Sequence, residues 1–307
     1  MIAVHACPVC GSREAREMFW VPDLEHPMGG SYPIERCLAC GAGYTGLVPS
    51  PKRLIDFYES NERRFRYGKT EKAFARIVEI LLGFDDPIVE QIPIPSPSSP
   101  ARLCLDIGSG PGVISTALSR SGWVTVAMDF DSRAAARSTN REYGFVLAMA
   151  DRLPFRDHSF NLVVVSHLLE HLYRPVPFLD GVRRVLAPGG ELLVAVPNLD
   201  STMARLFGPY LLSGYSVPRH LVHFTPHSLR RALESAGFAI HEIRTVPYAM
   251  FVGSVLLKAG VARNRIIRNR LFDVLRAMGS PIDIALALRG SGTTLLARAS
   301  TLDEATL

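Results

Sequence analysis

The chain has no N-terminal basic stretch followed by an apolar segment, so the sequence predicts no secretory signal and a cytoplasmic location. Its longest apolar stretch, residues 248–262, is interrupted by Lys258 and is too short to span a bilayer. The excess of positive charge is small as well. A net charge of +5 over 307 residues does not favour a nucleic-acid partner. These absences leave a globular chain long enough for one full domain with smaller attachments.

Cysteine is scarce, and four of the five cysteines form two C-x-x-C pairs, Cys7 with Cys10 and Cys37 with Cys40. In a reducing compartment such pairs bind metal more often than they form disulfides. Four thiolates fill a tetrahedral Zn²⁺ shell and leave no open position, so we expect a structural zinc site in a ribbon-like domain. A pair of reactive dithiols is the alternative. The fifth cysteine, Cys104, lies in an apolar run and is expected to be a small core residue.

The stretch from residue 103 to residue 120 predicts the first unit of a doubly wound α/β sheet. An apolar strand at 103–107 contains Asp106 near its end, a glycine-rich turn follows, and a helix is expected from Val113. Dinucleotide-binding turns have the pattern G-x-G-x-x-G, whereas the third glycine here, Gly112, comes one place early. An anionic pyrophosphate gains nothing from a preceding carboxylate, but a ligand with a free ammonium group does.

Two further acids follow the next predicted strands. The strand at 123–129 ends in Asp129, about 20 residues beyond Gly108, which is the spacing at which an acid reaches ribose hydroxyls. That position supports a nucleoside cofactor without choosing between a dinucleotide and S-adenosylmethionine. The strand at 145–149 is followed by Asp151, for which a plain turn acid is the alternative to a ligand contact.

Several motifs in the right order resemble the class I S-adenosylmethionine-dependent methyltransferases. The D-x-G-x-G-x-G turn at 106–112 resembles their first motif, residues 150–155 resemble their adenine-contacting segment, and L-x-P-G-G-x-L-x-V-x-V-P-N at 186–198 resembles the turn before their fifth strand. The resemblance covers about residues 101–246 and implies a Rossmann-like, seven-stranded, doubly wound sheet with S-adenosylmethionine as cofactor. The residues that it assigns to the cofactor are Asp106, Ile107, Gly108, Ser109, Gly110, Gly112, Asp129, Phe130, Asp151, Arg152, Ser166 and His167.

The predicted fourth strand, 159–166, runs into a histidine-rich segment. His167 and His171 are four residues apart, which places them on one helical face with Glu170 beside them. Three roles stay open here: a cofactor wall with helix packing, a general base, or a metal site. Ubiquinone-type O-methyltransferases carry E-x-x-E-H at this place and use a divalent cation, but His167 replaces the first Glu, which disfavours a hard cation.

A second histidine-rich segment, P-R-H-L-V-H-F-T-P at 218–226, resembles the ubiquinone-biosynthesis-like subgroup, which is often associated with cell-surface polysaccharide and lipid pathways. In that fold the loop after strand five borders the acceptor pocket. His220 and His223 are therefore candidates to deprotonate a hydroxyl or to bind an acidic acceptor, together with His171. Hydrogen bonds that only anchor the loop are the alternative.

The expected domain organisation follows from these motifs. Residues 1–50 form the zinc-ribbon-like domain, and C-x-x-C-G followed by P-x-P resembles bacterial methyltransferases with an N-terminal zinc-binding domain. Residues 51–100 hold a helical connector, with a helix at 72–82, and a Pro/Ser-rich linker. Residues 101–307 form the methyltransferase domain, with a helical insertion at about 248–290 between the last two strands. Its arginine-rich helix near 263–276 is expected to act as a lid or to make a peripheral contact with the inner face of the membrane.

The expected activity is O-methylation of a small-molecule, sugar or lipid-linked glycan acceptor, while N- and C-methylation stay open. One alternative is an NAD(P)-dependent sugar-modifying enzyme, which Asp106 and Val113 disfavour. The other is a non-catalytic zinc-ribbon adaptor with a vestigial cofactor fold. The ribbon is poor in Lys and Arg, which argues against contact with nucleic-acid phosphates.

Overall fold

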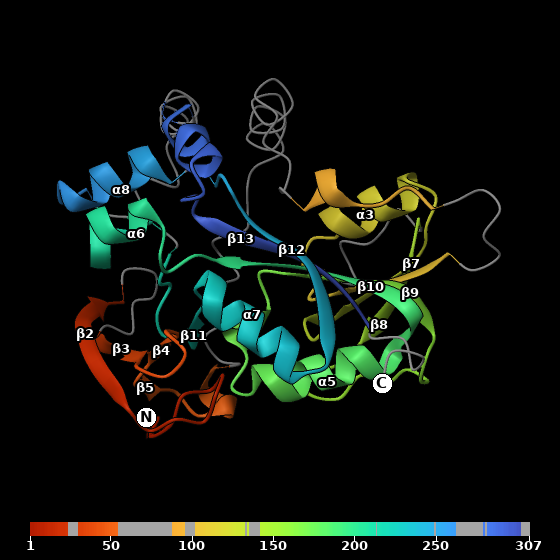
Figure 1. Ribbon diagram of the computed structural model, residues 1–307, viewed down its shortest axis with the longest axis horizontal. Coiled ribbons are helices and arrows are strands. Elements are labelled where there is room, and N and C mark those ends of the chain that lie inside the picture. Colours follow the sequence, from red (N-terminus) through yellow and green to blue (C-terminus); the bar gives the residue numbers. More distant parts are fainter. Residues whose placement is uncertain are drawn as a thin grey trace. The chain divides into compact units, whose positions relative to one another are not determined.

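The computed structural model describes residues 1–23, 30–54, 88–95, 102–132, 134, 142–212, 214–248, 250–261, 279 and 281–301 (Figure 1). The chain forms two compact units. Unit 1 comprises Met1–Asp85, Pro197–His227 and Thr245–Thr294, and unit 2 comprises Asp86–Val196, Ser228–Arg244 and Leu295–Leu307. The helices expected at 72–82 and 263–276 lie outside the described residues.

A seven-stranded sheet forms the centre of unit 2, as the sequence predicts. In spatial order its strands are β12 (Phe238–Val246), β13 (Thr294–Thr301), β10 (Leu186–Pro197), β9 (Phe160–Ser166), β6 (Leu103–Ile107), β7 (Val124–Asp129) and β8 (Gly144–Leu147). β6 pairs in parallel with both β7 and β9, and the chain continues from β6 toward β7 and β8 before it returns to β9 and β10. The order therefore reverses between β6 and β9, and ligands of such sheets bind beyond the carboxyl ends of the strands at this point.

The strands form where the sequence is apolar on both faces. Four consecutive residues of β9, Leu162 to Val165, are fully buried, which is the pattern of a parallel strand covered on two sides. The helix α3 (Val113–Arg120) begins at the expected residue, and α5 (Pro175–Val185) and α7 (Pro226–Ser235) are the other α-helices that bury one face in this part of the chain. This unit also contains the 3₁₀ turns η2 (Val89–Gln91) and η3 (Leu169–His171).

Two local expectations are corrected by the structure. The Pro-Gly-Gly turn, expected before the fifth strand, lies inside β10 as an irregularity: the strand begins at Leu186, which pairs with Phe160, and Glu191 pairs with Leu162. The segment after β9 is not a helix that carries His167 and His171 on one face. His167 has a φ of 50° and precedes the single turn η3.

Unit 1 contains a four-stranded sheet in the order β11–β4–β3–β2. Its strands are β2 (Ala15–Pro22), β3 (Ser31–Cys37), β4 (Gly43–Thr45) and β11 (Val222–His223). The first three come from the ribbon sequence and pair antiparallel as a meander, whereas β11 comes from the segment that follows β10. A small second sheet pairs β1 (Ile2–Ala3) with β5 (Leu47–Val48).

The core of unit 1 joins residues that are distant in sequence. Val21, Tyr32 and Ile34 of the ribbon strands belong to the same buried cluster as Leu199 and Tyr215 of the segment after β10. The helices of this unit include α6 (Thr202–Phe207), the 3₁₀ turn η4 (Gly208–Tyr210) and α8 (Phe251–Lys258), and residues 51–54 and 281–288 are helical as well.

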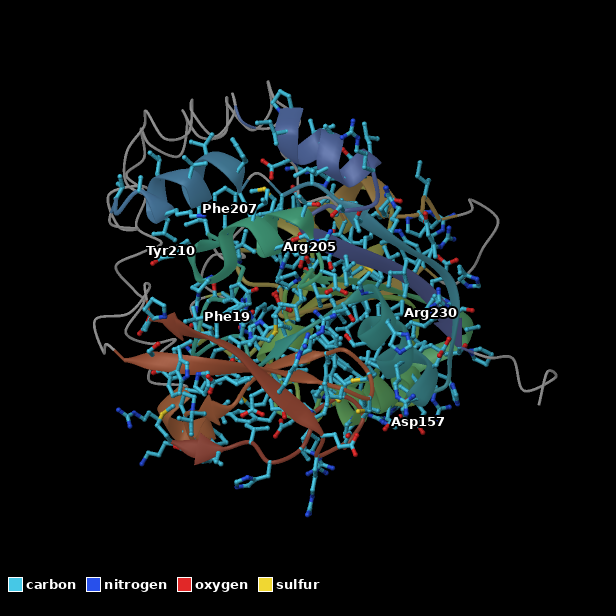
Figure 2. All side chains as sticks on the ribbon, turned by 60° about the vertical axis from the view of Figure 1, so that its left-hand side comes forward. Phe19, Asp157, Arg205, Phe207, Tyr210 and Arg230 are labelled. Carbon is cyan, nitrogen blue, oxygen red and sulfur yellow. The ribbon has the colours of Figure 1, made fainter. Side chains whose placement is uncertain are left out.

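Aromatic packing ties α6 to α8. Phe207, labelled in Figure 2, meets Phe251 edge-on with ring centroids 6.1 Å apart, and Lys258 Nζ lies 5.8 Å from its ring centre. The helices found among the described residues are all too short or too polar to cross a membrane.

Candidate functional site

The two C-x-x-C pairs form two knuckles with the same backbone hydrogen bonds. In each, the N–H of the first cysteine donates to a carbonyl five residues on, from Cys7 to Ser12 and from Cys37 to Ala42. The glycine after the second cysteine, Gly11 or Gly41, has φ above 70° and donates its N–H to the carbonyl of the first cysteine. That positive φ explains the glycines, because other residues adopt it at a cost.

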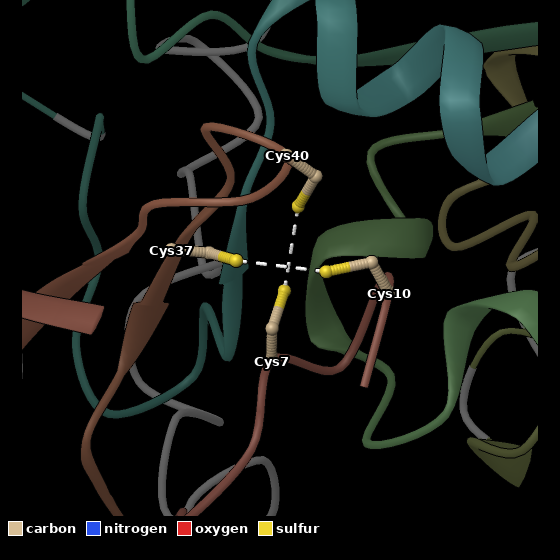
Figure 3. A group of neighbouring side chains, drawn as sticks. All are labelled: Cys7, Cys10, Cys37 and Cys40. Atoms are coloured by element: carbon tan, nitrogen blue, oxygen red, sulfur yellow. Dashed lines mark hydrogen bonds between the residues drawn. The ribbon is translucent and has the colours of Figure 1, made fainter. Parts of the chain in front are cut away.

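The four sulfur atoms point toward one centre (Figure 3). Cys7 Sγ lies 3.5 Å from Cys40 Sγ, Cys10 Sγ lies 3.5 Å from Cys37 Sγ, and all four atoms lie within 4.8 Å of one another. A zinc ion with Zn–S bonds of about 2.3 Å requires tetrahedral sulfur separations of about 3.8 Å. The four cysteines are therefore positioned to hold a metal ion, and an all-thiolate donor set with this spacing fits Zn²⁺.

Proton sharing prepares the cluster for a metal. The hydrogen bond with Cys40 lowers the pKa of the Cys7 thiol to about 5. The same contact, together with burial, raises the pKa of Cys40. One sulfur of the pair is thus a thiolate at neutral pH, and thiolate is the form that binds metal. Cys104 differs: burial raises the pKa of its thiol to about 12, and it lies in the core of β6 as expected.

The turn between β6 and α3 takes the form that its glycines predict. Gly108, Gly110 and Gly112 all have positive φ, between 48° and 79°. The N–H groups of Gly108 and Ser109 donate to the carbonyl of Met128 in β7, so the turn is fastened to the neighbouring strand.

Side chains pack closely against two of these glycines. A Cβ on Gly108 would lie 3.2 Å from Leu168, and one on Gly112 would collide with the Tyr143 hydroxyl. Only glycine fits either position without displacing a neighbour.

The two strand-end acids hold the turn in place. Asp106 is 1% exposed and accepts a hydrogen bond of 2.5 Å from the hydroxyl of Ser115 in α3. Asp129 accepts from the N–H of Gly110 through one oxygen, at 2.8 Å, and from the N–H of Asp131 through the other, at 2.9 Å. Each carboxylate oxygen has two lone pairs, so Asp129 can accept ribose hydroxyls in addition. Asp106, the glycine turn and Asp129 are thus one connected group.

The other expected cofactor residues divide into three sets. Ile107 and Ser109 are buried within or beside the turn, and Phe130 follows Asp129 with a partly exposed ring. Ser166 and His167 lie at the carboxyl end of β9, the other neighbour of β6. Asp151 and Arg152 are exposed in a turn beyond β8, and no described contact joins them to the glycine turn.

The segment at the end of β9 contains a buried carboxylate, that of Glu170, which is not among the predicted cofactor or catalytic residues. Glu170 is 1% exposed, and its Oε1 lies 3.4 Å from Nδ1 of His167. Burial raises the pKa of this carboxyl, but the contact with His167 and the charges of His171 and His167 outweigh burial, so its pKa is below the ordinary value. His171 is half-buried in η3. Sequence periodicity cannot reveal this pair, because it depends on the left-handed conformation at His167.

The remaining candidate bases, His220 and His223, lie in unit 1 and are both buried. His220 Nδ1 lies 3.2 Å from the carbonyl oxygen of Gly214, and His223 Nε2 lies 3.3 Å from the hydroxyl of Thr45. The structure also assigns parts to three residues that sequence reasoning missed: Ser115 at Asp106, Tyr143 at Gly112 and Thr45 at both histidines. Buried hydroxyl groups carry no periodic signal, so none of these could be found from the pattern.

In sequence the chain is similar to known methyltransferases. A family model described as "Methyltransferase domain" matches residues 72–243. The chain is similar to the demethylmenaquinone methyltransferase of Beutenbergia cavernae, with 30% identity over 165 residues that cover 52% of this chain and 66% of that protein. It is 33% identical over 123 residues to the demethylmenaquinone methyltransferase of Mycobacterium sp. strain KMS, which covers 39% of this chain and 52% of that protein. The chain thus spans about half to two thirds of these curated relatives.

The fold has a solved counterpart. A chain of the complex containing the Haloferax volcanii Trm112 methyltransferase activator superposes with a TM-score of 0.50 at 17% identity, covering 74% of this chain and 93% of that one. At that identity the likeness shows the fold alone.

Proposed function

Since this chain belongs to the family of methyltransferase domains, we propose that it transfers a methyl group from S-adenosylmethionine to a hydroxyl oxygen of a small-molecule acceptor. The observation that carries the proposal is the connected group of Asp106, the glycine turn and Asp129 at the point where the strand order reverses. A buried carboxylate beneath the turn favours a ligand with a positive charge and disfavours a pyrophosphate.

The described residues divide the binding task. The turn supplies backbone that a ligand can approach closely at Gly110, where a Cβ would meet nothing nearer than 4.0 Å. Asp129, with both oxygens already fixed by backbone N–H groups, presents its remaining lone pairs in a set orientation. Asp106 places negative charge close to the turn. Ser166 and His167 lie at the end of the adjoining strand β9.

The cofactor supplies an electrophilic methyl group on a sulfonium when it is bound. The chain then has to orient the acceptor and, for a hydroxyl, to accept its proton. His171, His220 and His223 are the proposed pool for that base. Hydrogen bonds that anchor His220 and His223 are already part of the structure, so a purely structural role competes with the catalytic one.

The chemical class of the acceptor is inferred from the similar proteins. The similar proteins are named for methylating demethylmenaquinone, a small molecule, which supports a small-molecule acceptor for this chain. A sugar or a lipid-linked glycan is the narrower proposal from the sequence. The proposed peripheral membrane contact depends on residues 263–276, which lie outside the described part of the chain.

Calorimetric titration with S-adenosylhomocysteine and, separately, with NAD tests the cofactor. We expect saturable heat with the former and none with the latter, whereas the reverse result would replace the proposal with the dinucleotide alternative. A panel of quinols, phenols and hydroxylated sugars, incubated with S-adenosylmethionine and read by mass spectrometry, tests the acceptor. A gain of one methyl group on a nitrogen or carbon atom would refute the O-methyl assignment.

A further inference from the structure

The segment that follows β10 is built into the metal-binding ribbon. β11 pairs antiparallel with β4 through Val222 opposite Tyr44 and His223 opposite Gly43. This pairing covers the outer edge of β4, whose backbone groups would otherwise be unpaired along that side. A two-residue pairing is too short to persist by itself, so β11 depends on other contacts to stay in place.

Thr45 provides the densest of these contacts. Its backbone N–H donates to the carbonyl of Leu221 at 3.0 Å, and its hydroxyl donates to the carbonyl of His220 at 2.7 Å. The same hydroxyl oxygen lies 3.3 Å from Nε2 of His223. Thr45 is completely buried, so removal of its hydroxyl would take this partner from the His220 carbonyl and from Nε2 of His223 without giving water in exchange. One threonine therefore contacts three residues of the segment, His220, Leu221 and His223.

These contacts determine where the two imidazoles carry their protons. A hydroxyl has one proton, and that of Thr45 is given to the His220 carbonyl, so Nε2 of His223 must be the donor in its contact with Thr45. The partner of His220 Nδ1 is a carbonyl oxygen of Gly214, which can only accept. His220 is thus protonated on Nδ1 and His223 on Nε2.

The knuckle that holds Cys37 and Cys40 touches the same segment. Arg36, which precedes Cys37, forms an ion pair of 2.9 Å with Asp200. A Cβ on Gly43 would lie 2.7 Å from Leu199 and 3.1 Å from Cβ of His223. The backbone after Cys40 is therefore in direct contact with both of these residues. Thr45 is the last residue of β4, which begins at Gly43, three residues after Cys40. The sulfur cluster and Thr45 are thus joined by one short strand.

We propose that the four-cysteine centre is the support of the segment 214–223 and that Thr45 is the positioning residue that holds the backbone at His220 and fixes the ring tautomer of His223. The relevance of those rings to catalysis rests on the proposed function, but the support does not. Without metal the cysteines of the second knuckle lose the ion that holds them, β4 loses its position, and Thr45 can no longer hold the segment. The ribbon is then an integral part of unit 1 and not a separate recognition module.

Hydrogen exchange read by mass spectrometry on the full, zinc-loaded chain tests the support. Chelation of the metal should speed exchange in peptides spanning 214–224 by about tenfold or more, while peptides spanning β6 and α3 stay protected. Thr45→Val should reproduce the effect at 214–224 with the metal still bound. Thr45→Ser, which retains the hydroxyl, should not.

A matched control exists in Thr294, which is equally buried but whose hydroxyl has no hydrogen-bond partner among the described residues. Thr294→Val should leave exchange at 214–224 unchanged. Nitrogen-15 NMR of labelled histidines should show the proton on Nδ1 of His220 and on Nε2 of His223, with the second assignment lost in Thr45→Val. The opposite tautomers in the wild type would overturn the positioning role.

Unchanged exchange at 214–224 after chelation would overturn the support, and so would equal loss of protection in β6 and α3, because the effect would then be global unfolding. Titration with S-adenosylhomocysteine separates this inference from the proposed function. If the zinc-loaded wild type binds none, the proposed function fails, while the exchange and tautomer results still decide the role of the ribbon.

Discussion

The contact between Tyr143 and Gly112 allows a quantitative test of the cofactor turn. Gly112 has a φ of 79°, and a Cβ added there would collide with the Tyr143 hydroxyl. Gly112→Ala therefore introduces two separate costs, the left-handed backbone and the collision. Tyr143→Phe removes the atom that collides, and the next ring atom, Cζ, would lie 3.0 Å from the new Cβ. The pair thus forms a double-mutant cycle in which only the collision is relieved.

The two costs can be given rough sizes. A left-handed alanine costs about 1 kcal/mol, and forcing an atom into occupied space costs about 1–3 kcal/mol. Gly112→Ala should therefore destabilise the wild type by about 3 kcal/mol but the Tyr143→Phe background by only about 1–2 kcal/mol. Tyr143→Phe by itself should cost about 1 kcal/mol, because the hydroxyl is hydrogen-bonded to the side chain of Thr116.

Urea unfolding of the four proteins measures the cycle, and S-adenosylhomocysteine titration measures its effect on the turn. Affinity should fall about tenfold for Gly112→Ala and about threefold in the phenylalanine background, since 1.4 kcal/mol corresponds to a factor of ten. Gly122 is a matched control: its φ is 94°, but its Cβ would meet nothing closer than 3.6 Å. Gly122→Ala should cost about 1 kcal/mol in both backgrounds. Additive costs at Gly112, within about 0.5 kcal/mol, would refute the collision.

Three further outcomes are expected. Ser115→Ala removes the donor to Asp106 and should weaken S-adenosylhomocysteine binding about tenfold, while calorimetry with 5′-methylthioadenosine, which lacks the amino-acid part, should show little change; equal losses would contradict a role for Asp106 toward the ammonium group. Burial raises the pKa of Asp283 to about 6, above its unfolded value, so the folded state holds the proton longer and stability should fall as pH rises from about 4 to 6 and then level off. Asp283→Asn should abolish that slope in urea unfolding, and a slope that persists would exclude Asp283 as its source. Cys37→Ser should reduce bound zinc well below one equivalent by elemental analysis, whereas Ser12→Ala, beside the other knuckle, should not.

The sequence predicts unit 2 well because its signals are local. β6 begins and ends at the expected residues, Leu103 and Ile107, since an apolar run followed by glycines leaves few alternatives. α3 begins at Val113 for the same reason. The predicted domain boundaries at 50 and 100 stay predictions, while the compact units group residues 197–227 and 245–294 with the N-terminal stretch.

The end of β9 shows where periodicity misleads. His167 and His171 have the spacing of a helical face, but the chain must turn sharply after Ser166 to pack Leu168 against Gly108. The left-handed conformation at His167 makes that turn, and it directs the imidazole toward Glu170. A close approach to a glycine three strands earlier in the sequence has no signature in the local pattern.

The pairing of β11 with β4 fails to be predictable for a related reason. β11 consists of only two residues, and Thr45 and His223 are 178 positions apart in the sequence. No repeat or alternation can be read from so short a strand. Contacts between distant segments can nevertheless be recognised in the structure by buried hydroxyl groups. Thr45 and Ser115 are both fully buried. Because an uncompensated buried hydroxyl is costly, each must be explained by a partner, and each leads to one, His220 for Thr45 and Asp106 for Ser115. The same reasoning makes valine the informative replacement at Thr45, since it preserves the shape and removes only the link.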